Sequence, residues 1–592
     1  MTVLLIAIGS ALLYLVAYHT YGKWLGSKLF RLSAERVTPA VELEDGNDYV
    51  PTSKGIIFGH HFTSIAGTGP IVGPALAVIW GWVPAVLWVL FGSIFIGAVH
   101  DFGSLVVSLR NKGQTVGDIA GRVLSPQARF LFLTILFLAL TIVLAIFGLV
   151  IAAVFKIYPT AIFPCLLQIP IAVVIGILLH RRKIPLLFPS LLTLGLMYLS
   201  VVFGNVGFLG EINTFLASLP IISWVVILLV YSYIASVLPV WVLLQPRDFI
   251  NSLQLLSSLA LIISGLVVAG LFGVDQGHGK HSLEIVAPAF RLSPEGAPPM
   301  FPFLFITIAC GAVSGFHCLV SSGTSSKQLK CETDARAVGY GSMLTEGFLA
   351  IIVILACVAG LGLGVHKDGA FLSGLDAYGD RYATWNSAQG LGAKIGAFVD
   401  GAANFLQALR IPAEVAVAIM GVFVASFAAT TLDTACRLQR YVTQELASQL
   451  KIRPLTTKHG ATIFAVVLAA LLACPPAPGS EWSLENLGKG GLLLWPLFGA
   501  TNQLLGGLAF VVIIFWLRMK KAPTWFIIPS ALVMLVLPGC VMIHQLFIGK
   551  GAWLTGESPN YLLAVFSILT VLIEVWIIKE AVKAWRNEGT LE

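Results

Sequence analysis

The sequence predicts an all-α polytopic membrane protein. Of its 592 residues, 57% are hydrophobic and only 11% are charged, which is typical of proteins that cross a bilayer many times. Apolar runs of about 20 residues recur along the whole chain, and this is the length that a helix needs to span the hydrocarbon core. Counting these runs predicts about 15 transmembrane helices. The connections between them are too short to hold a separate soluble domain.

Basic residues are spread unequally over the connections between the apolar runs. One alternating set of connections holds most of the 36 Lys and Arg residues, for example Lys451, Arg453 and Lys458. Because basic connections stay in the cytoplasm, the pattern predicts a periplasmic N-terminus and a cytoplasmic C-terminus. This topology explains the net charge of +7 without a nucleic-acid partner. The first run, residues 2–18, follows no basic residue, so we expect a retained helix rather than a signal peptide.

Two of the apolar runs, residues 55–80 and 301–326, contain groups that interrupt a helix. In the first run Gly67, Gly69 and Pro70 lie close together among polar side chains. Glycine loses more backbone entropy in a helix than other residues and proline lacks the N–H donor, so we expect the helix to unwind here. In lipid, unwound backbone persists only where it is buried in protein or lines a cavity.

The second run echoes the first. His61 is followed six residues later by the Gly-Thr pair 67–68, and His317 is followed six residues later by the Gly-Thr pair 323–324. The predicted topology makes the two runs antiparallel, as an inverted repeat requires. Interrupted helices at corresponding positions of two halves indicate a transporter binding site.

The two runs also set the predicted organisation of the chain. The second break comes later than a simple repeat would place it, so we expect inserted helices. The predicted parts are an N-terminal extra helix with a cytoplasmic loop (1–54), a first repeat with inserted helices (55–300), a second repeat (301–522) and C-terminal extra helices (523–592).

We expect the substrate to bind between the two breaks. Backbone amides freed at the first break suit a carboxylate, whereas hydroxyls and carbonyls at the second break, placed at 321–324, suit an amine or amide. The candidate residues are His60, His61, Ser64, Gly67, Thr68, Gly69, His317, Ser321, Ser322, Gly323 and Thr324.

The adjacent histidines His60 and His61 have three interpretations. Imidazole titrates near physiological pH, which favours contact with the substrate or with protons. Structural hydrogen bonding comes second. A metal ion shared with His317 comes third, because adjacent residues of a helix point about 100° apart. The sequence leaves the metal open and indicates no cofactor.

Ionisable residues inside apolar runs are costly and are candidates for ion coupling. His100 and Asp101 lie near the inner end of run 82–107, where they act as a gate or proton relay or simply mark the membrane interface. Glu346 lies near the inner end of another run, and we expect it to pair with Arg336 or another cytoplasmic cation.

Run 411–436 ends with a further set of candidates for ion coupling, Thr430, Thr431 and Asp433. Hydroxyl and carboxylate oxygens are ligands that a hard monovalent cation prefers, and Thr430 and Asp433 share a helix face. The alternative, which we favour, is a plain ion pair between Asp433 and Arg437 at i+4.

Three classes of function can be compared on motifs. A secondary transporter explains the paired breaks, and the chain has no GxxxxGK[ST] sequence for direct ATP coupling. An intramembrane enzyme would need a metal-ligand motif such as H-E-x-x-H, which the sequence lacks. A sensor would need a signalling domain and a channel would need a charged pore ring, and the connections are too short for the former. We therefore expect a transporter and not an enzyme.

Several motifs resemble the carbon starvation protein A family. They are Asp45-Gly46-Asn47-Asp48-Tyr49-Val50-Pro51-Thr52, Gly59-His60-His61-Phe62, Ser64-Ile65-Ala66-Gly67, Gly97-Ala98-Val99-His100-Asp101-Phe102 and Phe427-Ala428-Ala429-Thr430-Thr431-Leu432-Asp433-Thr434. The resemblance covers nearly the whole chain.

This resemblance implies an inner-membrane peptide transporter with close relatives that move pyruvate with protons. It also implies kinship with the amino acid–polyamine–organocation superfamily and a LeuT-type inverted-repeat core. In that core a hydroxyl pair on the eighth helix, here run 411–436, contributes to a sodium site.

We therefore expect a secondary active transporter that imports peptides across the bacterial inner membrane by alternating access, coupled to protons or sodium. A pyruvate or monocarboxylate–proton symporter is the alternative. The expected partners are the substrate, the coupling ion and the lipid bilayer, without nucleic acid.

Overall fold

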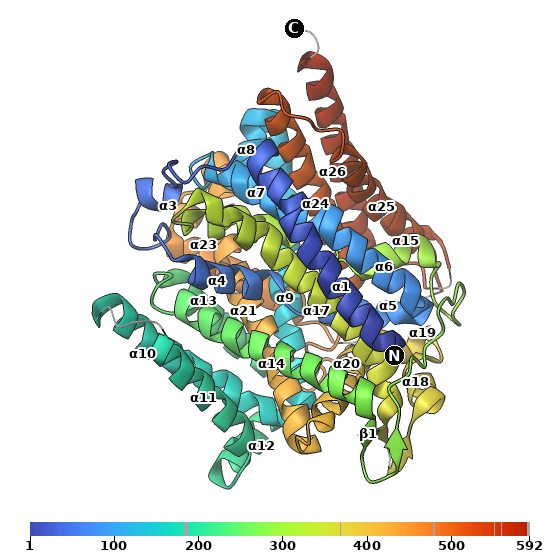
Figure 1. The fold of residues 1–592 in the computed structure, drawn as a ribbon. Helices are drawn as coiled ribbons and strands as arrows, with labels where there is room; N and C mark the ends of the chain where they lie inside the picture. The colour runs from blue at the N-terminus through green and yellow to red at the C-terminus, as the bar shows by residue number, and fades with distance from the viewer. Residues whose placement is uncertain (183–186, 368, 477–479, 550, 558, 589–592) are drawn as a thin grey trace.

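Long apolar helices make up most of the chain (Figure 1). The structure is a computed structural model that describes residues 1–182, 187–367, 369–476, 480–549, 551–557 and 559–588. Its described strands are short and form two antiparallel pairs: β1 (Val274–Asp275) with β2 (Lys280–His281), and β3 (Val365–Lys367) with β4 (Ala370–Leu372). The described chain is thus mainly helical, as predicted. The end of the predicted C-terminal part, 589–592, lies outside the described residues.

The α-helices follow one another along the chain with short connections. The first half contains α1 (Thr2–His19), α2 (Tyr21–Trp24), α3 (Pro39–Glu42), α4 (Lys54–Ile65), α5 (Gly69–Ala77), α6 (Trp82–Gly92), α7 (Ala98–Leu109), α8 (Val116–Val123), α9 (Pro126–Ile157), α10 (Ile162–Arg182), α11 (Leu187–Phe203), α12 (Phe208–Ser218), α13 (Ile221–Val237) and α14 (Leu244–Phe272). The second half contains α15 (Met300–Thr307), α16 (Gly315–Gly323), α17 (Ser342–Leu355), α18 (Gly374–Tyr382), α19 (Trp385–Gln389), α20 (Leu391–Ala408), α21 (Ala413–Leu450), α22 (Arg453–Thr456), α23 (Lys458–Ala473), α24 (Trp495–Met519), α25 (Ile528–Phe547) and α26 (Tyr561–Glu588).

Short turns of other helix types extend or join these helices. The π-helical turns are η1 (Leu25–Leu29), η3 (Ser93–Gly97), η7 (Arg336–Gly341) and η8 (Ala356–Gly360). The 3₁₀ turns are η2 (Val78–Trp80), η4 (Pro159–Ala161), η5 (Ser325–Lys327), η6 (Glu332–Asp334), η9 (Leu361–Leu363) and η10 (Gly491–Leu494). π turns are frequent at functional sites, and two of them, η3 and η7, stand directly before α7 and α17.

Ten of the described helices are long and apolar enough to cross a membrane, or up to twelve if each of two bent pairs is one span. The bent pairs are Lys54–Ile65 with Gly69–Trp80, at 45°, and Phe188–Phe203 with Phe208–Ser218, at 79°. Two shorter apolar helices, α13 and α23, come in addition. The chain is therefore a multi-pass membrane protein, while the number of about 15 spans stays a prediction.

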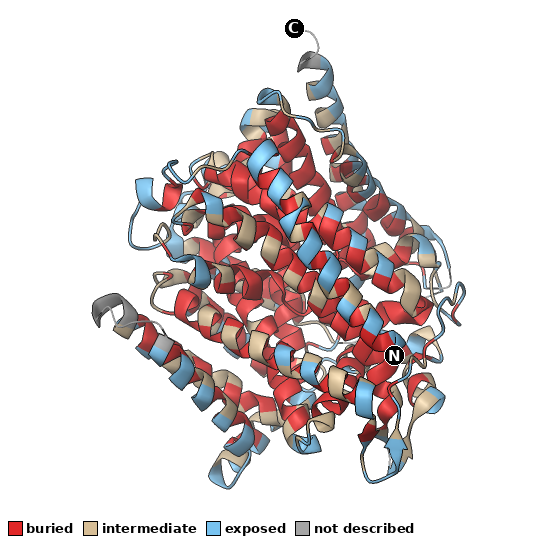
Figure 2. Cartoon of the chain, viewed as in Figure 1, coloured by how far each residue is buried: buried red, intermediate tan, exposed pale blue. Residues whose placement is uncertain are grey.

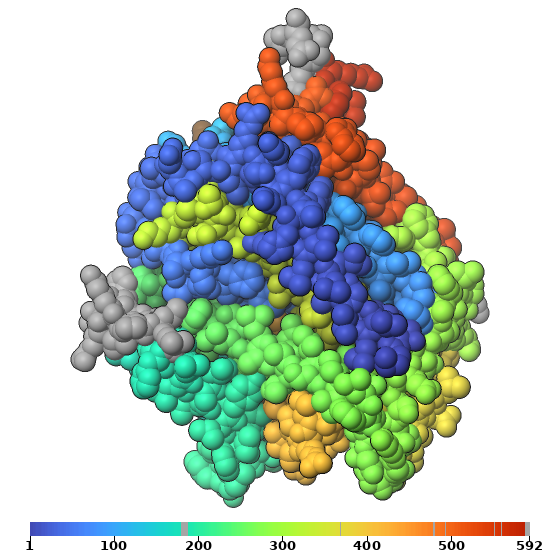
Figure 3. Space-filling view, in the orientation of Figure 1, coloured from blue at the N-terminus to red at the C-terminus, as the bar shows by residue number. Residues whose placement is uncertain are grey.

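Central helices are buried on all sides and outer helices are not (Figure 2). The most apolar stretch of α24 is entirely buried, whereas only 33% of the corresponding stretch is buried in α26 and in the span that begins with α1. Figure 3 shows α1 lying across the surface of one face of the molecule. Apolar side chains on such outer helices suit contact with lipid, which is as apolar as they are.

α4 and α5 are the two halves of the first interrupted helix, as predicted. They are separated by residues 66–68, and α5 begins at Gly69 with Pro70 next to it. Proline suits the first turn of a helix because its missing N–H would have no helical partner there. The Thr431 hydroxyl on α21 donates to the Ser64 carbonyl at 3.2 Å, which satisfies an acceptor freed at the end of α4.

The second run is also interrupted, but not where the sequence predicted. Its unwound residues are 308–314, between α15 and α16. Ser321, Ser322 and Gly323 lie within α16, and Thr324 is the residue that ends it. The predicted break at these residues is therefore wrong.

A side chain from a distant helix explains the position of the second break. Asn502 on α24 accepts a hydrogen bond from the Phe316 backbone N–H at 2.8 Å and another from the Ser314 hydroxyl at 3.1 Å. A backbone donor freed at the start of α16 is thereby satisfied. The first break follows His61 whereas the second precedes His317, so the echo in the sequence does not mark equivalent breaks.

Candidate functional site

The two interruptions touch each other. A Cβ atom built on Gly69 would overlap the side chain of Cys310, and one built on Gly73 would overlap the carbonyl group of Thr307. Only glycine permits so close an approach at these two positions. The start of α5 therefore crosses the chain at the second interruption, and both breaks lie in one buried region.

All eleven residues predicted to contact the substrate are buried. Several of their side chains are already used within the protein: His61 Nδ1 lies 2.7 Å from Ser325 Oγ, and Ser64 Oγ lies 3.0 Å from Thr434 Oγ1. The hydroxyls of Ser322 and Thr324 donate to carbonyls of their own helix.

Two of the predicted hydroxyls, those of Thr68 and Ser321, have no hydrogen-bond partner among the described residues. Buried polar groups in proteins are nearly always hydrogen-bonded, so an exception needs an explanation such as a ligand or water. Thr68 lies in the first break and Ser321 lies one turn beyond His317 on α16. These two hydroxyls are therefore the predicted residues best placed to contact a ligand.

His60 belongs to a buried network of charges that links α4, α14 and α21. Its Nδ1 lies 2.6 Å from Asp248 Oδ2, and the other oxygen of Asp248 lies 3.0 Å from the Arg247 guanidinium. Arg247 also pairs with Asp433. None of the four side chains is more than 3% exposed. Buried charges persist where they are paired and hydrogen-bonded, so this network joins the first interrupted helix to its neighbours.

Asp433 does not pair with Arg437, and that prediction was wrong. Arg437 lies 2.5 Å from Asp48 in the connection before α4, and Arg440 lies 3.3 Å from the same carboxylate. Burial acts to raise the pKa of Asp48, but Arg437 and Arg440 outweigh it and lower that pKa to about 2. Asp433 is neutralised by Arg247 instead, which makes it a weaker candidate ligand for a cation.

The neighbouring residues Thr430 and Thr431 face different helices. Thr430 Oγ1 accepts a hydrogen bond from Asn251 on α14 at 2.8 Å, on the face where Asp433 meets the same helix. Thr431 Oγ1 donates to the Ser64 carbonyl at the first break. The three residues predicted to bind a coupling cation are therefore divided, and Thr431 is the one that reaches the break.

A second buried cluster joins α7, α16 and α17. Asp101 Oδ1 lies 2.7 Å from His100 Nδ1, and Asp101 Oδ2 lies 2.9 Å from His317 Nδ1. On its other side, His317 Nε2 lies 3.4 Å from Glu346 Oε2. All four side chains are fully buried. His100 and Asp101 are therefore paired inside the protein and do not face solvent or lipid.

Glu346 and Arg336 do not form the predicted ion pair. The Arg336 guanidinium lies 4.9 Å from the centre of the Tyr18 ring, and Glu346 lies next to His317 instead. Within the described ranges, no group of three or more His, Cys, Asp or Glu side chains is arranged to hold a metal ion. The histidines are instead divided between the two networks and the Ser325 contact.

Sequence comparison assigns the chain to a family. The family profile described as "Carbon starvation protein CstA" matches residues 1–371 and 375–538. The chain belongs to the carbon starvation protein A family. Both buried networks lie entirely within the matched residues of this family member.

Curated relatives of this family member carry two kinds of name. "Peptide transporter CstA" of Campylobacter jejuni subsp. jejuni is 32% identical, over 90% of this chain and 78% of that protein. "Peptide transporter CstA" of Bacillus subtilis is 31% identical, over 99% of this chain and 97% of that protein. "Pyruvate/proton symporter BtsT" of Escherichia coli K12 is 30% identical, over 98% of this chain and 90% of that protein.

Three residues that organise the site in this family member were not predicted: Arg247, Asp248 and Asn502. Hydropathy alone places the start of this apolar run near residue 252, which leaves Arg247 and Asp248 in a connection, whereas α14 begins at Leu244. The rule that charges inside a membrane are functional candidates finds them once the helix is given its true length. Asn502 has a weaker sequence signal, as one of three adjacent polar residues (Thr501, Asn502 and Gln503) in a mainly apolar helix.

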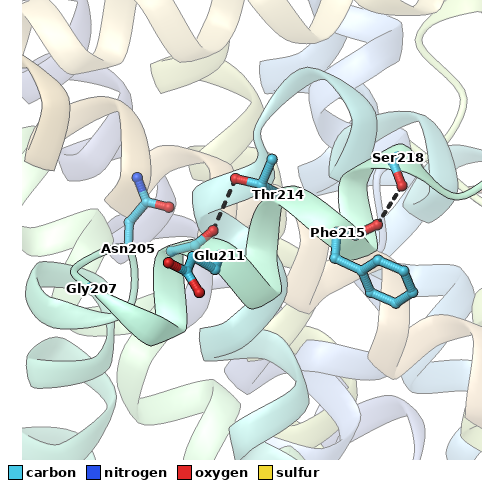
Figure 4. Close-up of a pocket in the computed structure, with 7 residues that line it drawn as sticks. Asn205, Gly207, Glu211, Thr214, Phe215 and Ser218 are labelled. Atoms are coloured by element: carbon cyan, nitrogen blue, oxygen red, sulfur yellow. Dashed lines mark hydrogen bonds between the residues drawn. The ribbon is translucent and has the colours of Figure 1, made fainter.

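An open hollow at the edge of this family member is formed by α12 and the turn before it (Figure 4). It is lined by Asn205, Gly207, Gly210, Glu211, Thr214, Phe215 and Ser218. None of these lining residues belongs to α4, α5, α15 or α16, so the hollow lies outside the site at the breaks. A narrow gap between α9, α16 and α24 lies nearer to the second break, and Phe316 and Asn502 border it.

Proposed function

We propose that this protein is a secondary active transporter that imports peptides across the bacterial inner membrane by alternating access, driven by a proton or sodium gradient. The observation that carries the proposal is the crossing of the two interrupted helices at Gly69 and Cys310. Broken helices that meet within a membrane protein provide backbone groups for a substrate and ions. Several relatives named peptide transporters match along most of the chain.

The first break is the proposed site for the substrate carboxylate. Residues 66–68 lie between α4 and α5; the Ala66 N–H still donates to the Phe62 carbonyl, and α5 starts at Gly69. The amides that follow Ala66 and the positive end of the helix dipole point into the break. The Thr68 hydroxyl, which has no partner among the described residues, adds a donor there. The Ser321 hydroxyl on α16 serves the other end of the substrate.

Pyruvate or a related monocarboxylate is the second candidate substrate. The relative named "Pyruvate/proton symporter BtsT" matches 98% of this chain. A peptide and pyruvate both carry a carboxylate, so the same amides at the first break suit either one.

The proposed architecture is a LeuT-type inverted repeat with about 15 spans. Its repeats would comprise 55–300 and 301–522, with 1–54 and 523–592 as additions, and the N-terminus would be periplasmic. The interrupted helices α4–α5 and α15–α16, one in each proposed repeat, support this reading. Protons are the favoured coupling ion, because the buried cluster around His317 offers imidazole and carboxyl groups that bind protons while Asp433 is already neutralised by Arg247.

Uptake into proteoliposomes tests the proposed function. Purified protein is reconstituted, and uptake of labelled dialanine and labelled pyruvate is measured side by side under an imposed proton gradient or sodium gradient. We expect dialanine uptake that the proton gradient stimulates. Stimulated pyruvate uptake alone would favour the second candidate, and uptake of neither compound under either gradient would contradict both.

A further inference from the structure

Glu346 is an unsatisfied acidic group next to the second break. It is fully buried on α17, and neither of its carboxylate oxygens has a hydrogen-bond partner among the described residues. His317 Nε2 lies 3.4 Å from one of them and also lacks a hydrogen-bond partner in the described part of the chain. A buried carboxylate that receives no hydrogen bond is very costly as an anion, so such a group binds a proton instead.

The hydrogen bonds to Asp101 determine where hydrogens lie on the neighbouring histidines. Asp101 accepts from Nδ1 of His100 and from Nδ1 of His317, so each of these nitrogens carries a hydrogen. A neutral His317 then presents a lone pair on Nε2 to Glu346. A lone pair and an anionic carboxylate repel each other, so this arrangement is stable when one proton lies between them.

The described surroundings of Glu346 supply no fixed positive charge. The ionisable groups that face the pair from neighbouring elements are His61 on α4, His100 and Asp101 on α7 and Cys310 in the second break. Tyr14 on α1 lies beside the neighbouring Gly347, with its hydroxyl on Ser93. No Lys or Arg within the described ranges forms an ion pair with Glu346. Asp101 adds a negative charge beyond His317, so a mobile proton is the charge that balances Glu346.

We propose that Glu346 binds the proton that drives transport and that His317 Nε2 receives it. Before the transfer, Glu346 is a neutral carboxylic acid in this proposal. On transfer, the O–H bond of Glu346 breaks and an N–H bond forms on His317, which leaves an imidazolium between two carboxylates, Asp101 and Glu346. His317 lies on α16 directly after the second break and Glu346 lies on α17. A movement of the half-helix α16 therefore makes or breaks the path of the proton.

Three hydroxyls without a hydrogen-bond partner among the described residues continue the cluster: Ser104, Ser321 and Ser342. Each stands four residues from His100, His317 or Glu346 on the same helix, and residues with this spacing share a helix face. In the proposed orientation each hydroxyl lies on the cytoplasmic side of its neighbour. Ser104 and Ser342, which have no role in binding the proposed substrate, provide the route by which the proton leaves toward the cytoplasm.

This inference rests on the proposed transport function, and the test separates the two. Uptake of labelled dialanine and pyruvate is measured in proteoliposomes for the wild type, Glu346→Gln and Glu574→Gln. Glu574 is a matched control because it is a buried glutamate on α26, next to Gly539 and outside the cluster. We expect Glu346→Gln to lose stimulation by the proton gradient but to keep exchange of substrate without a gradient. The control should keep both.

Stimulation that survives in Glu346→Gln would overturn the proposal, whichever substrate is moved. If the wild type moves neither substrate, the proposed function fails, and infrared spectroscopy still tests the proton site. The wild type at neutral pH should then show a protonated-carboxyl band, part of which disappears in Glu346→Gln. A band unchanged by Glu346→Gln would contradict the proposal without any measurement of transport.

A second variant covers the case in which Glu346→Gln does not fold. His317→Gln removes the group that receives the proton while leaving Glu346 in place, so the Glu346 proton should persist to higher pH than in the wild type. The same infrared band, followed as a function of pH, measures this shift. An unchanged titration in His317→Gln would show that His317 is not the acceptor.

Discussion

Asp433 on α21 and Arg247 on α14 form an ion pair buried inside the protein. Arg247 also holds Asp248, which in turn holds His60 beside the first break. The contact therefore links the long helix α21 to the interrupted helix through α14. It also explains why Asp433 does not pair with Arg437, which is closer in the sequence but forms an ion pair with Asp48.

Asp433→Asn should destabilise the protein, because Arg247 would keep its charge but lose one of its two carboxylates. Removing one partner of a buried ion pair typically costs about 3–5 kcal/mol. Chemical denaturation in detergent measures the change. A double variant, Asp433→Leu with Arg247→Met, should recover much of the stability because neither charge remains buried. Unchanged stability with lost stimulation by sodium would instead assign Asp433 to a cation site.

Gly67→Val should abolish uptake while leaving membrane insertion intact. A Cβ at Gly67 would lie 2.9 Å from Thr431 Oγ1 and 3.0 Å from the Phe147 ring, so the larger side chain fills the first break and displaces Thr431. Gly195→Val is the matched control, since Gly195 on α11 is exposed and has no atom within 4 Å of its added Cβ. Uptake retained in Gly67→Val would show that the substrate does not pass through the first break.

The stability that Asp48 contributes should be lost in acid. Its pKa in the folded protein is about 2, against an ordinary value of 3.8, so the carboxylate contributes stability that is complete above the ordinary value and is lost as the pH falls through about 2. The difference corresponds to about 2 kcal/mol.

Denaturation at several acidic pH values, compared with Asp48→Asn, measures this contribution. The variant should lack this part of the acid dependence and should be less stable at neutral pH. Glu44→Gln, an exposed residue in the same connection, serves as the control. Equal acid dependence of the wild type and Asp48→Asn would contradict the assignment of the Arg437 and Arg440 contacts to Asp48.

Asn502→Leu should lower stability and uptake together, because the Phe316 N–H at the start of α16 would lose its acceptor. A buried donor left without a partner costs about 1–3 kcal/mol. Asn502→Asp keeps an acceptor oxygen at the same place and should retain the start of α16, although it loses the amide donor. Amide hydrogen exchange at Phe316 measures the effect directly. Protection equal to the wild type in Asn502→Leu would show that α16 starts there for another reason.

The sequence predicted many residues of the buried region around the breaks, but it did not predict which charged side chains pair with each other. The predicted residues His60, His61, Thr68 and His317 all fall in the buried region around the breaks. Spacing along one helix suggested Arg437 as the partner of Asp433, and a nearby cytoplasmic cation such as Arg336 was expected for Glu346. Both pairs are absent, because the true partners come from distant segments. A spacing rule compares residues on one helix and carries no information about which helix lies opposite.

The sequence by itself determined the class of the protein and the position of the first break. Bilayer thickness imposes apolar runs of about 20 residues whatever the fold, and the Gly-Pro residues at 67–70 act on their own backbone. Only the tertiary structure decided where the second break lies and which charges meet. Those outcomes depend on Asn502, Arg247 and Glu346, which lie on other helices than their partners. A buried polar group is stabilised by whichever partner the packing places within hydrogen-bonding distance.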